Sequence, residues 1–407
     1  MSAQTDISID PFLTEEYSRD PAPVVARIRA EDPVHWIPGV DAWMVTRYDD
    51  VRQLFADPNV TPNPFAFERY QPPPEGTAMR WVAENTPFAA PPEQHARMRR
   101  LVSAAFTPRA IRRQEKQVRE VVEFHAAPLR GRKGAVDVVK DFTGPIPNAV
   151  IARITGVPPK GDDEARFRQL AGDMVRGISP FLTDEERARS EKATVEICDY
   201  TRELAMERRK RPEEDLISDL LSAHGTDGPV TNDEIVLMVA GLVAAGSETT
   251  TIGGSRAIRT LLQHSDQMAI LREDASLVAN AVSEVLRFDF GSAGLPRYAL
   301  NDFELRGKTI RKGQVLMLSF TGAHRDPEVF RDPDRFDVRR DTKDLTIFGH
   351  GPHYCLGANL ARTEMGCMIE AALDFLPAGA RLLEDRIEWS RASMFSRIQA
   401  LPIDFGA

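Results

Sequence analysis

The stretch Phe348-Gly349-His350-Gly351-Pro352-His353-Tyr354-Cys355-Leu356-Gly357-Ala358 leads into a helical pattern over 357–375. Three glycines around one cysteine indicate a tight turn at which the backbone closely approaches another body. Because the helix begins just after Cys355, its free N–H groups and positive dipole end would favour a thiolate there. Cys355 is therefore expected to be a nucleophile, a metal ligand or a packed thiol.

These three interpretations of Cys355 differ in what they require of its neighbours. A packed thiol has no need of the surrounding glycines. A zinc site could use His350, His353 and Cys355, but a fourth ligand and a familiar spacing are missing. A lone thiolate on haem iron would use the glycines to let the backbone pass over the porphyrin, with N–H groups directed at the sulfur.

The segment resembles the haem-binding loop of the cytochrome P450 family, whose pattern is Phe-Gly-x-Gly-x-His/Arg-x-Cys-x-Gly. All six constrained positions match, namely Phe348, Gly349, Gly351, His353, Cys355 and Gly357. The resemblance extends over essentially the whole chain and is sharpest from 231 to 370. It implies a soluble bacterial haem-thiolate monooxygenase whose haem b (iron protoporphyrin IX) is ligated by Cys355.

Helical patterning dominates the chain and predicts helices at 22–31, 48–57, 93–106, 108–128, 144–155, 163–178, 183–211, 231–263, 275–289 and 357–375. Strand-like alternation is confined to Val34–Ile37 with Trp43–Thr46 around a Pro-Gly turn, and to Tyr298–Leu305 with Gln314–Leu318. We expect a mainly α fold with a small β region. No repeat or break in composition marks a linker, so a single domain over 1–407 is predicted. The resemblance implies that haem lies between the helices at 231–263 and 357–375.

Residues 61–92 form a proline-rich stretch that also carries five aromatic side chains, namely Phe65, Phe67, Tyr70, Trp81 and Phe88. Its eight prolines argue against a regular helix or strand. A long irregular loop in a compact domain is usually functional. We predict a substrate-access loop, the alternative being a surface meander held by its aromatic residues.

His95 and Arg99 fall on one helical face, because they are four residues apart. The resemblance implies that these two residues, together with Arg297 and His353, hold the haem propionates through charge-assisted hydrogen bonds. It also assigns Phe348, Gly349, Gly357 and Ala245 to the haem site. Without the resemblance, an exposed charged face would be the preferred interpretation of His95 and Arg99.

The segment Ala245-Gly246-Ser247-Glu248-Thr249-Thr250 lies in the most apolar helix of the chain. A glycine here costs about 1 kcal/mol against alanine, so something is expected to pack against the helix or enter it. The hydroxyls could simply bond to their own backbone carbonyls. The resemblance implies instead that Glu248 and Thr249 deliver protons during dioxygen activation, although many relatives carry Asp at the acid position.

Glu284 and Arg287 have the spacing of a helical ion pair. The resemblance implies that they form a buried charge network below the haem loop, with Arg335 as its third member. Removing one partner would then leave a buried charge at a cost of about 3–5 kcal/mol.

The substrate pocket is predicted from the loop at 61–92 and from three further regions of the chain. Its candidate residues are Leu242, Ala245, Phe290, Ala293, Leu295 and Phe395, with Met394 beside the last. Because residues 291–294 are all small, they are expected to leave room for a substrate. None of these side chains is ionisable, which is consistent with a medium or large, mostly apolar substrate.

The 407 residues include 52 basic and 61 acidic side chains, a net charge of −9, which argues against nucleic-acid binding. Three cysteines cannot supply a four-thiolate cluster. The N-terminus lacks the pattern of a signal peptide and the longest apolar run is only 12 residues, so a cytoplasmic protein with no membrane partner is expected.

Electrons are expected from a separate protein, because no flavin or iron–sulfur motif follows residue 370. A basic cluster is predicted to dock an acidic ferredoxin, unless it is only a solvated face; its members are Arg97, Arg100, Arg109, Arg112 and Arg113. Two rival functions stay open. One is a haem-thiolate protein that is not a monooxygenase, either a peroxide-dependent enzyme or a catalytically silent binding module that recruits other proteins, and the Glu248-Thr249 pair argues against both. The other is a zinc or cysteine hydrolase.

Overall fold

The computed structural model describes residues 17, 19–105, 108–156, 162–177, 182–223, 228–291, 294–390 and 396–406. Within it, contacts between Cα atoms group the chain into two compact units, each assembled from segments far apart in sequence. Unit 1 comprises residues 1–70, 255–354 and 381–403, and unit 2 comprises residues 71–254, 355–380 and 404–407. The predicted access loop at 61–92 is therefore divided between them after Tyr70.

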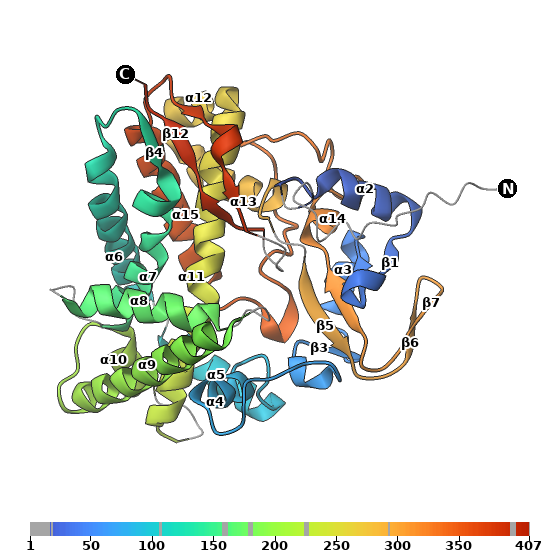
Figure 1. The fold of residues 1–407 in the computed structure, drawn as a ribbon, viewed down its shortest axis with the longest axis vertical. Helices are drawn as coiled ribbons and strands as arrows, with labels where there is room; N and C mark the ends of the chain where they lie inside the picture. Colours follow the sequence, from blue (N-terminus) through green and yellow to red (C-terminus); the bar gives the residue numbers. More distant parts are fainter. Residues whose placement is uncertain are drawn as a thin grey trace. The chain divides into compact units, whose positions relative to one another are not determined.

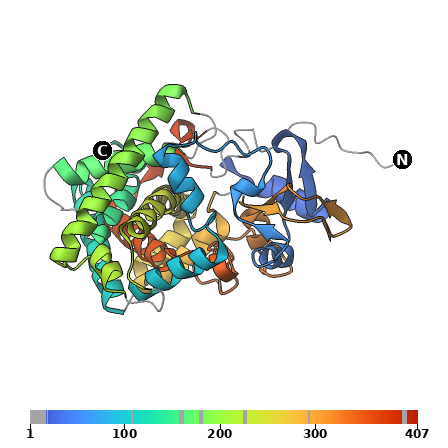
Figure 2. The same cartoon turned by 90° about the horizontal axis from the view of Figure 1, so that it is seen from below.

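Unit 2 is built almost entirely from helices (Figure 1). Its elements are α4 (Ala78–Asn85), α5 (Pro92–Ala105), α6 (Pro108–Ala126), β4 (Ala135–Asp137), α7 (Pro145–Thr155), α8 (Asp162–Arg176), α9 (Asp184–Lys210), α10 (Leu216–Ser222) and α15 (Ala358–Phe375). The longest helix, α11 (Asn232–Gln263), begins in this unit and ends in unit 1. Figure 2 looks along α11, with the green helices of unit 2 around it.

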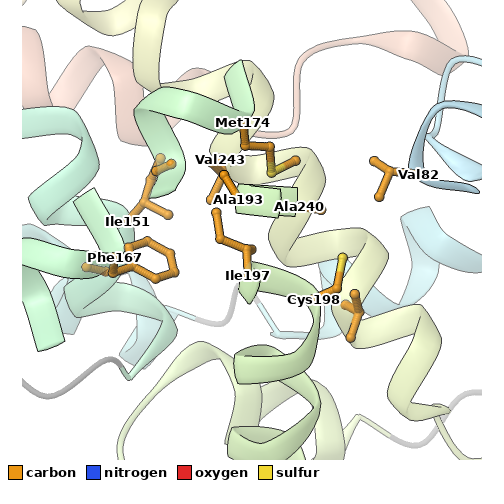
Figure 3. Packing of buried hydrophobic residues seen from close by; sticks show 12 residues of the cluster. Val82, Ile151, Phe167, Met174, Ala193, Ile197, Cys198, Ala240 and Val243 are labelled. Carbon is orange, nitrogen blue, oxygen red and sulfur yellow. The ribbon is translucent and has the colours of Figure 1, made fainter. Parts of the chain in front are cut away.

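The core of unit 2 lies where α4, α7, α8, α9 and α11 meet. Figure 3 shows the apolar side chains that these helices contribute, among them Ile151, Phe167, Ile197 and Val243, each at most 4% exposed. On α11 the residues Val236, Ala240 and Val243 face this cluster, as expected for positions separated by about one helical turn.

Unit 1 carries the small β region. Its helices are α2 (Ala22–Glu31), α3 (Tyr48–Leu54), α12 (Ser265–Glu273), α13 (Val278–Phe288) and α14 (Phe320–His324). Its strands are β1 (Val34–Ile37), β2 (Ala42–Val45), β3 (Val60–Thr61), β5 (Leu295–Ala299), β6 (Phe303–Leu305), β7 (Lys308–Ile310), β8 (Val315–Leu318), β9 (Arg381–Leu382), β10 (Glu388–Trp389), β11 (Ile398–Ala400) and β12 (Pro402–Asp404).

The main sheet of unit 1 has the order β1-β2-β8-β5-β3. The predicted N-terminal hairpin is present, with Val34 opposite Val45, and β2 pairs in parallel with β8 from a distant part of the chain. A second hairpin, β6–β7, turns through Arg306 and Gly307, both in the left-handed region. The expectation of a mainly α fold with a minor sheet built from distant segments is confirmed.

The access-loop prediction needs one correction, because α4 lies inside the proline-rich stretch. The helix forms between Pro74 and Pro87, where no proline interrupts it. Its first N–H groups are bound from outside, since the Glu191 carboxylate of α9 accepts hydrogen bonds from Ala78 and Met79 at 2.6 and 3.0 Å. The prolines on either side of α4 led the sequence pattern to be interpreted as an irregular loop. The helix forms because a side chain of α9 binds its first N–H groups.

The aromatic residues of the same stretch pack on separate parts of the fold. In unit 1 the ring of Phe67 stacks on that of Tyr298 with centroids 5.9 Å apart, and Phe65 packs edge-on against Tyr70. In unit 2 Trp81 packs against the core, with the Arg202 guanidinium 5.5 Å from its ring centroid. Phe88 is exposed.

Helix α11 is long and apolar enough by composition to cross a bilayer, with a mean hydropathy of 1.6 over its most apolar window. In the structure 61% of that window is buried inside the protein. A buried helix of this kind is typical of the interior of a large domain.

Candidate functional site

The cysteine loop is a succession of tight turns that ends at the start of α15. Gly349 and Gly351 have φ values of +76° and +72°, a conformation that favours glycine. The N–H of Gly349 donates to Thr346 and that of Tyr354 donates to Gly351, at 2.8 and 3.0 Å. These turns explain why glycine occupies positions 349 and 351, and Cys355 follows them directly.

Cys355 lies three residues before α15 and is the exposed cysteine of the chain, whereas Cys198 and Cys367 are buried. The surrounding protein raises the pKa of the Cys355 thiol, while a hydrogen bond from the Gly357 backbone and the charge of Arg99 act in the opposite direction. The net direction differs from the thiolate that we expected from the helix dipole alone. Because a thiol releases its proton to solvent when it coordinates a metal ion, the raised pKa does not conflict with a ligand role.

The two other thiols are unsuited to chemistry. Burial raises the pKa of Cys198 and of Cys367 to about 11 each, which leaves them as packed, inert side chains. Across the described residues no group of three or more His, Cys, Asp or Glu side chains could hold a metal ion. The zinc interpretation of Cys355 with His350 and His353 therefore finds no ligand cluster there.

Helix α5 places Arg99 close to Cys355 and carries His95 one turn earlier. His95 is buried, with 7% of its surface exposed. Burial lowers its pKa, and the nearby positive charge of Arg99 lowers it further. Arg99 in turn interacts electrostatically with Cys355. This face of α5 thus carries a buried, neutral imidazole and a cation that interacts with the cysteine, rather than an exposed polar surface.

Arg297 on β5 is a buried cation, 5% exposed, in unit 1. Its guanidinium donates to the carbonyl of the adjacent Pro296 at 2.9 Å and lies 4.8 Å from the Phe55 ring centroid. Burial lowers its pKa to about 10. No carboxylate among the described residues pairs with it, so the side chain is suited to an acidic group from a ligand. His353, also in unit 1, is half-buried in a short turn over Gly351–His353.

Helix α11 has an accessible face opposite its core face. Ala245 is exposed and Leu242 and Thr249 are half-buried, whereas Val243 and Ser247 on the other side are buried. Gly246 faces α7, where an added Cβ would lie 3.2 Å from Ile151. The expected packing against the helix is therefore present at this glycine.

The hydroxyls of this segment bond to backbone carbonyls one turn earlier in α11. Thr249 donates to Ala245 at 2.6 Å, Ser247 to Val243 at 2.8 Å and Thr251 to Ser247 at 2.9 Å. This local pattern was one of the two interpretations of the sequence. It leaves the Thr249 oxygen able to accept a further hydrogen bond on the accessible face. Glu248 is half-buried next to it.

A contact between α11 and α15 escaped the sequence analysis. A Cβ on Gly253 would lie 2.8 Å from the Met365 sulfur, and one on Gly254 would lie 2.4 Å from the Met368 sulfur. Two adjacent glycines in an apolar helix were the signal that could have revealed it. The contact brings the helix that carries Thr249 close to the helix that follows Cys355.

The predicted ion pair of α13 is present and fully buried, with Glu284 and Arg287 joined by two hydrogen bonds of 2.7 and 2.9 Å. The prediction that Arg335 supplies the third side chain of this network is wrong, however. Arg335 is 68% exposed and contributes only its backbone carbonyl to Arg287. The guanidinium that reaches Glu284, at 3.1 Å, belongs to Arg340. Both arginines belong to one turn-rich segment, and the chain places the second of them toward Glu284.

The substrate-pocket candidates are described only in part. Phe290 and Leu295 are half-buried, whereas Ala293, Met394 and Phe395 lie outside the described residues. The expectation that the glycines leave room is wrong for Gly291 and Gly294. An added Cβ would lie 2.1 Å from Arg256 at the first and 2.4 Å from the Leu318 carbonyl at the second, because other groups already fill that space.

Unit 1 also has a cavity of about 350 Å³. Its lining is rich in charged and polar side chains, among them Arg259, His264, Arg325 and Asp334. Phe290 reaches it, but its polar walls do not suit an apolar substrate.

The predicted basic cluster is largely paired with acidic side chains. Arg97 binds Glu234 at 2.5 and 3.1 Å. Arg109 pairs with Glu214, and Arg113 pairs with Asp219. Arg112 is exposed at the surface of α6. The positive charge available to a partner is thus smaller than the sequence suggests.

Two left-handed glycines precede Cys355 at the start of α15 and Arg99 lies close to it, an arrangement that fits a haem-thiolate protein. The chain belongs to the cytochrome P450 family, whose sequence model matches residues 34–374. It is 33% identical over 398 residues to cytochrome P450 monooxygenase PikC of Streptomyces venezuelae, covering 96% of this chain and 92% of that one. It is 32% identical over 396 residues to vitamin D(3) 25-hydroxylase of Pseudonocardia autotrophica, covering 95% and 94%.

Solved structures agree with this assignment. Cytochrome P450 CYP109Q5 from Chondromyces apiculatus superimposes with a TM-score of 0.85 at 31% identity, covering 97% of both chains. The protein therefore has the cytochrome P450 fold and is a haem-thiolate monooxygenase that uses dioxygen, an organic substrate and electrons from a redox partner.

Proposed function

We propose that Cys355 is the thiolate ligand of a haem b and that the enzyme oxidises a medium or large, mostly apolar substrate with electrons from a ferredoxin. The observation that carries the cysteine assignment is its position. Cys355 follows two left-handed glycines, lies just before α15 and has Arg99 close by.

The residues proposed to hold the haem propionates are His95, Arg99, Arg297 and His353. Arg297 gives the strongest support, because it is a buried cation with no carboxylate partner among the described residues. A propionate would supply the missing charge through charge-assisted hydrogen bonds. His95, neutral and buried, would donate a hydrogen bond rather than a full charge.

When bound, haem supplies the dioxygen chemistry by which one oxygen atom reaches the substrate. The part proposed for Glu248 and Thr249 is to hold and move protons on the accessible face of α11. Thr249 already donates to Ala245 at 2.6 Å, so its oxygen is oriented and can accept a further hydrogen bond. Glu248 would exchange protons with water.

The substrate is proposed to contact Leu242, Ala245, Phe290 and Leu295, with Ala293 and Phe395 as further contributors from the sequence. These side chains are apolar, and a relative is named as a hydroxylase of vitamin D(3). Support for an apolar ligand therefore comes from the chemistry of the side chains and from that relative's name.

An acidic ferredoxin is proposed to dock at the exposed part of the basic cluster, around Arg112, in a cytoplasmic setting. Reversal by Arg112→Glu should slow reduction by ferredoxin several-fold and weaken its dependence on salt. Lys192→Glu, an exposed charge on α9, is the matched control. Equal rates for the wild type and Arg112→Glu would remove this surface from the proposal.

The test of the haem assignment is the absorption spectrum of the purified protein, reduced with dithionite and exposed to carbon monoxide. The wild type and a Cys367→Ala control should give the long-wavelength Soret maximum of thiolate ligation, and Cys355→Ser should lose it. A colourless protein that does not take up haem, or a Cys355→Ser variant with the wild-type spectrum, would overturn the proposal.

A further inference from the structure

Among the described residues, Arg256 is the most deeply buried charged side chain to which the sequence assigned no function. It lies in the last turns of α11, within unit 1, and its side chain is 0% exposed. Burial lowers its pKa, and the carboxylate of Asp289 opposes that shift. A buried guanidinium is expensive unless its donors are satisfied, so its partners show what the residue holds together.

The partners of Arg256 come from two distant parts of the chain. On one side it forms an ion pair with Asp289, just after α13. On the other side Nε and Nη2 donate to the Ser396 carbonyl at 3.3 and 3.0 Å, and Nη2 also donates to the Ser396 hydroxyl at 2.9 Å. The guanidinium carbon lies 5.1 Å from the ring centroid of Trp389.

The backbone at Gly291 packs closely against the same guanidinium. A Cβ at this position would lie 2.1 Å from the Arg256 Nε, and the residue has a φ of +73°. Its carbonyl accepts a hydrogen bond from the Ser396 N–H at 2.6 Å. The segments at 289–291 and 396 are thus joined directly by their backbones and a second time through Arg256.

Both joined segments adjoin residues that the proposed function assigns to the substrate. Phe290 lies between Asp289 and Gly291, and Ser396 follows Phe395 in the sequence. We propose that Arg256 is a positioning residue that fixes the Asp289–Gly291 segment against Ser396 and thereby sets which bulky ligands the haem pocket accepts. This inference rests on the proposed function, because it assumes that Phe290 contacts the substrate.

A matched comparison is available on the same helix. Arg259 shares two partners with Arg256, since it binds Asp289 at 3.3 Å and lies 5.3 Å from the Trp389 ring centroid. Among the contacts described for it, none reaches Ser396. Arg259→Lys is therefore the control for Arg256→Lys. Asp289 keeps a cation in both variants, so neither leaves a buried carboxylate without a partner.

The experiment titrates the haem-loaded enzymes with two azoles that bind iron, imidazole and the bulkier 4-phenylimidazole, and follows the Soret shift. In Arg256→Lys we expect the ratio of the two dissociation constants to change by roughly tenfold, as for the loss of hydrogen bonds to a charged group. The constant for imidazole, which needs little room, should stay within about twofold. Arg259→Lys should keep the wild-type ratio. An unchanged ratio in Arg256→Lys would overturn the proposal, as would an equal change in both variants.

A second readout does not depend on bound azole. Hydrogen exchange of peptides containing Ser396 should be faster in Arg256→Lys than in Arg259→Lys, because the Ser396 N–H bond to Gly291 is no longer reinforced. Ser396→Ala, which removes the hydroxyl acceptor alone, should change the azole ratio in the same direction by a smaller factor; should Arg256→Lys fail to fold, a wild-type ratio in this variant would overturn the proposal. Loss of haem binding by the wild type would be a failure of the proposed function, whereas a normal carbon monoxide spectrum with an unchanged azole ratio would refute the Arg256 inference alone.

Discussion

Glu284 and Arg287 face each other with 0% of either side chain exposed, and two hydrogen bonds of 2.7 and 2.9 Å join the carboxylate to the guanidinium. The remaining donors of Arg287 go to backbone carbonyls, to His324 at 3.0 Å, Pro333 at 2.7 Å and Arg335 at 3.2 Å. The pair therefore connects α13 to two segments that precede the cysteine loop. Because every donor has an acceptor, the cost of burying the charges is offset.

Removing the Glu284 charge should destabilise the protein strongly. We expect Glu284→Gln to lower the free energy of unfolding by about 3–5 kcal/mol, because Arg287 would keep a buried charge without a counter-ion. Denaturant titration of the apoprotein measures this. The control is Glu120→Gln on α6, whose exposed carboxylate lies 3.9 Å from Lys116, and which should cost about 1 kcal/mol or less. Similar losses in the two variants would contradict the buried-pair interpretation.

The third side chain of the network can be identified by comparing two neighbouring arginines. Arg340→Gln should lower the free energy of unfolding by about 1–3 kcal/mol, because it removes a charged donor to Glu284. Arg335→Gln should change it by about 0.5 kcal/mol or less, since that side chain is largely exposed. Thermal and denaturant unfolding of both variants, measured side by side, would reject the assignment if Arg335→Gln were the more damaging.

The buried imidazole of His324 is expected to make the free energy of unfolding depend on pH. Burial, together with the charge of Arg287, lowers the pKa of this imidazole from 6.5 to about 3. Its Nε2 accepts the Thr346 N–H at 3.0 Å, which requires the neutral ring. As the pH falls below 6.5 the unfolded chain gains a proton that the folded protein cannot bind, so stability declines by about 1.4 kcal/mol per pH unit down to about pH 3.

His324→Gln keeps an acceptor for Thr346 and removes the titration. The decline in unfolding free energy between pH 6.5 and pH 4.5 should therefore be shallower in this variant than in the wild type. His125→Gln on α6 controls for the loss of a histidine elsewhere. Parallel stability curves for the wild type and His324→Gln would show that another group controls the acid dependence.

We expect Arg297 to lower the stability of the apoprotein and to raise its affinity for haem. Arg297→Met removes a buried cation that has no carboxylate partner among the described residues. The apoprotein should then be about 1–3 kcal/mol more stable, because an unpaired buried charge is replaced by an apolar side chain. Haem affinity should fall by roughly tenfold, since a charge-assisted hydrogen bond is lost. Unfolding of the apoprotein and haem titration measure the two effects; a drop in both quantities would mean that Arg297 has a structural partner.

The parts of the fold that the sequence predicted are those that local chemistry determines. The periodic segments at 22–31 and 34–37 coincide with α2 and β1, and α15 begins one residue after the predicted start. Four helices in the described chain have no counterpart among the predictions, α4, α10, α12 and α14. The first of these depends on a carboxylate from another helix, and α12 has only nine residues in which to show a period. Signals from tertiary contacts are not present in a local pattern.

The residues of the candidate site likewise fall into two groups, those that a local sequence pattern reveals and those that only tertiary contacts determine. Cys355 could be found because its glycines record the backbone conformation of a single loop. The contribution of Arg340 could not, since it is set by how the segment after α14 folds back to Glu284, 56 residues away. Arg256 was missed for a similar reason, because Asp289 and Ser396 meet it only after folding. A side chain whose partners are remote in sequence cannot be recognised from a local sequence motif.

The glycine pair of α11 has a consequence for anyone who wishes to redesign this catalyst. The sulfurs of Met365 and Met368 lie against Gly253 and Gly254, so an added methyl group at either position would require the facing methionine side chain to move. Directed-evolution libraries should therefore leave positions 253 and 254 constant and place their diversity at Leu242 and Ala245, where the helix surface is accessible. The same helix thus combines a close contact with α15 and an accessible face on which the proposed substrate contacts can be varied.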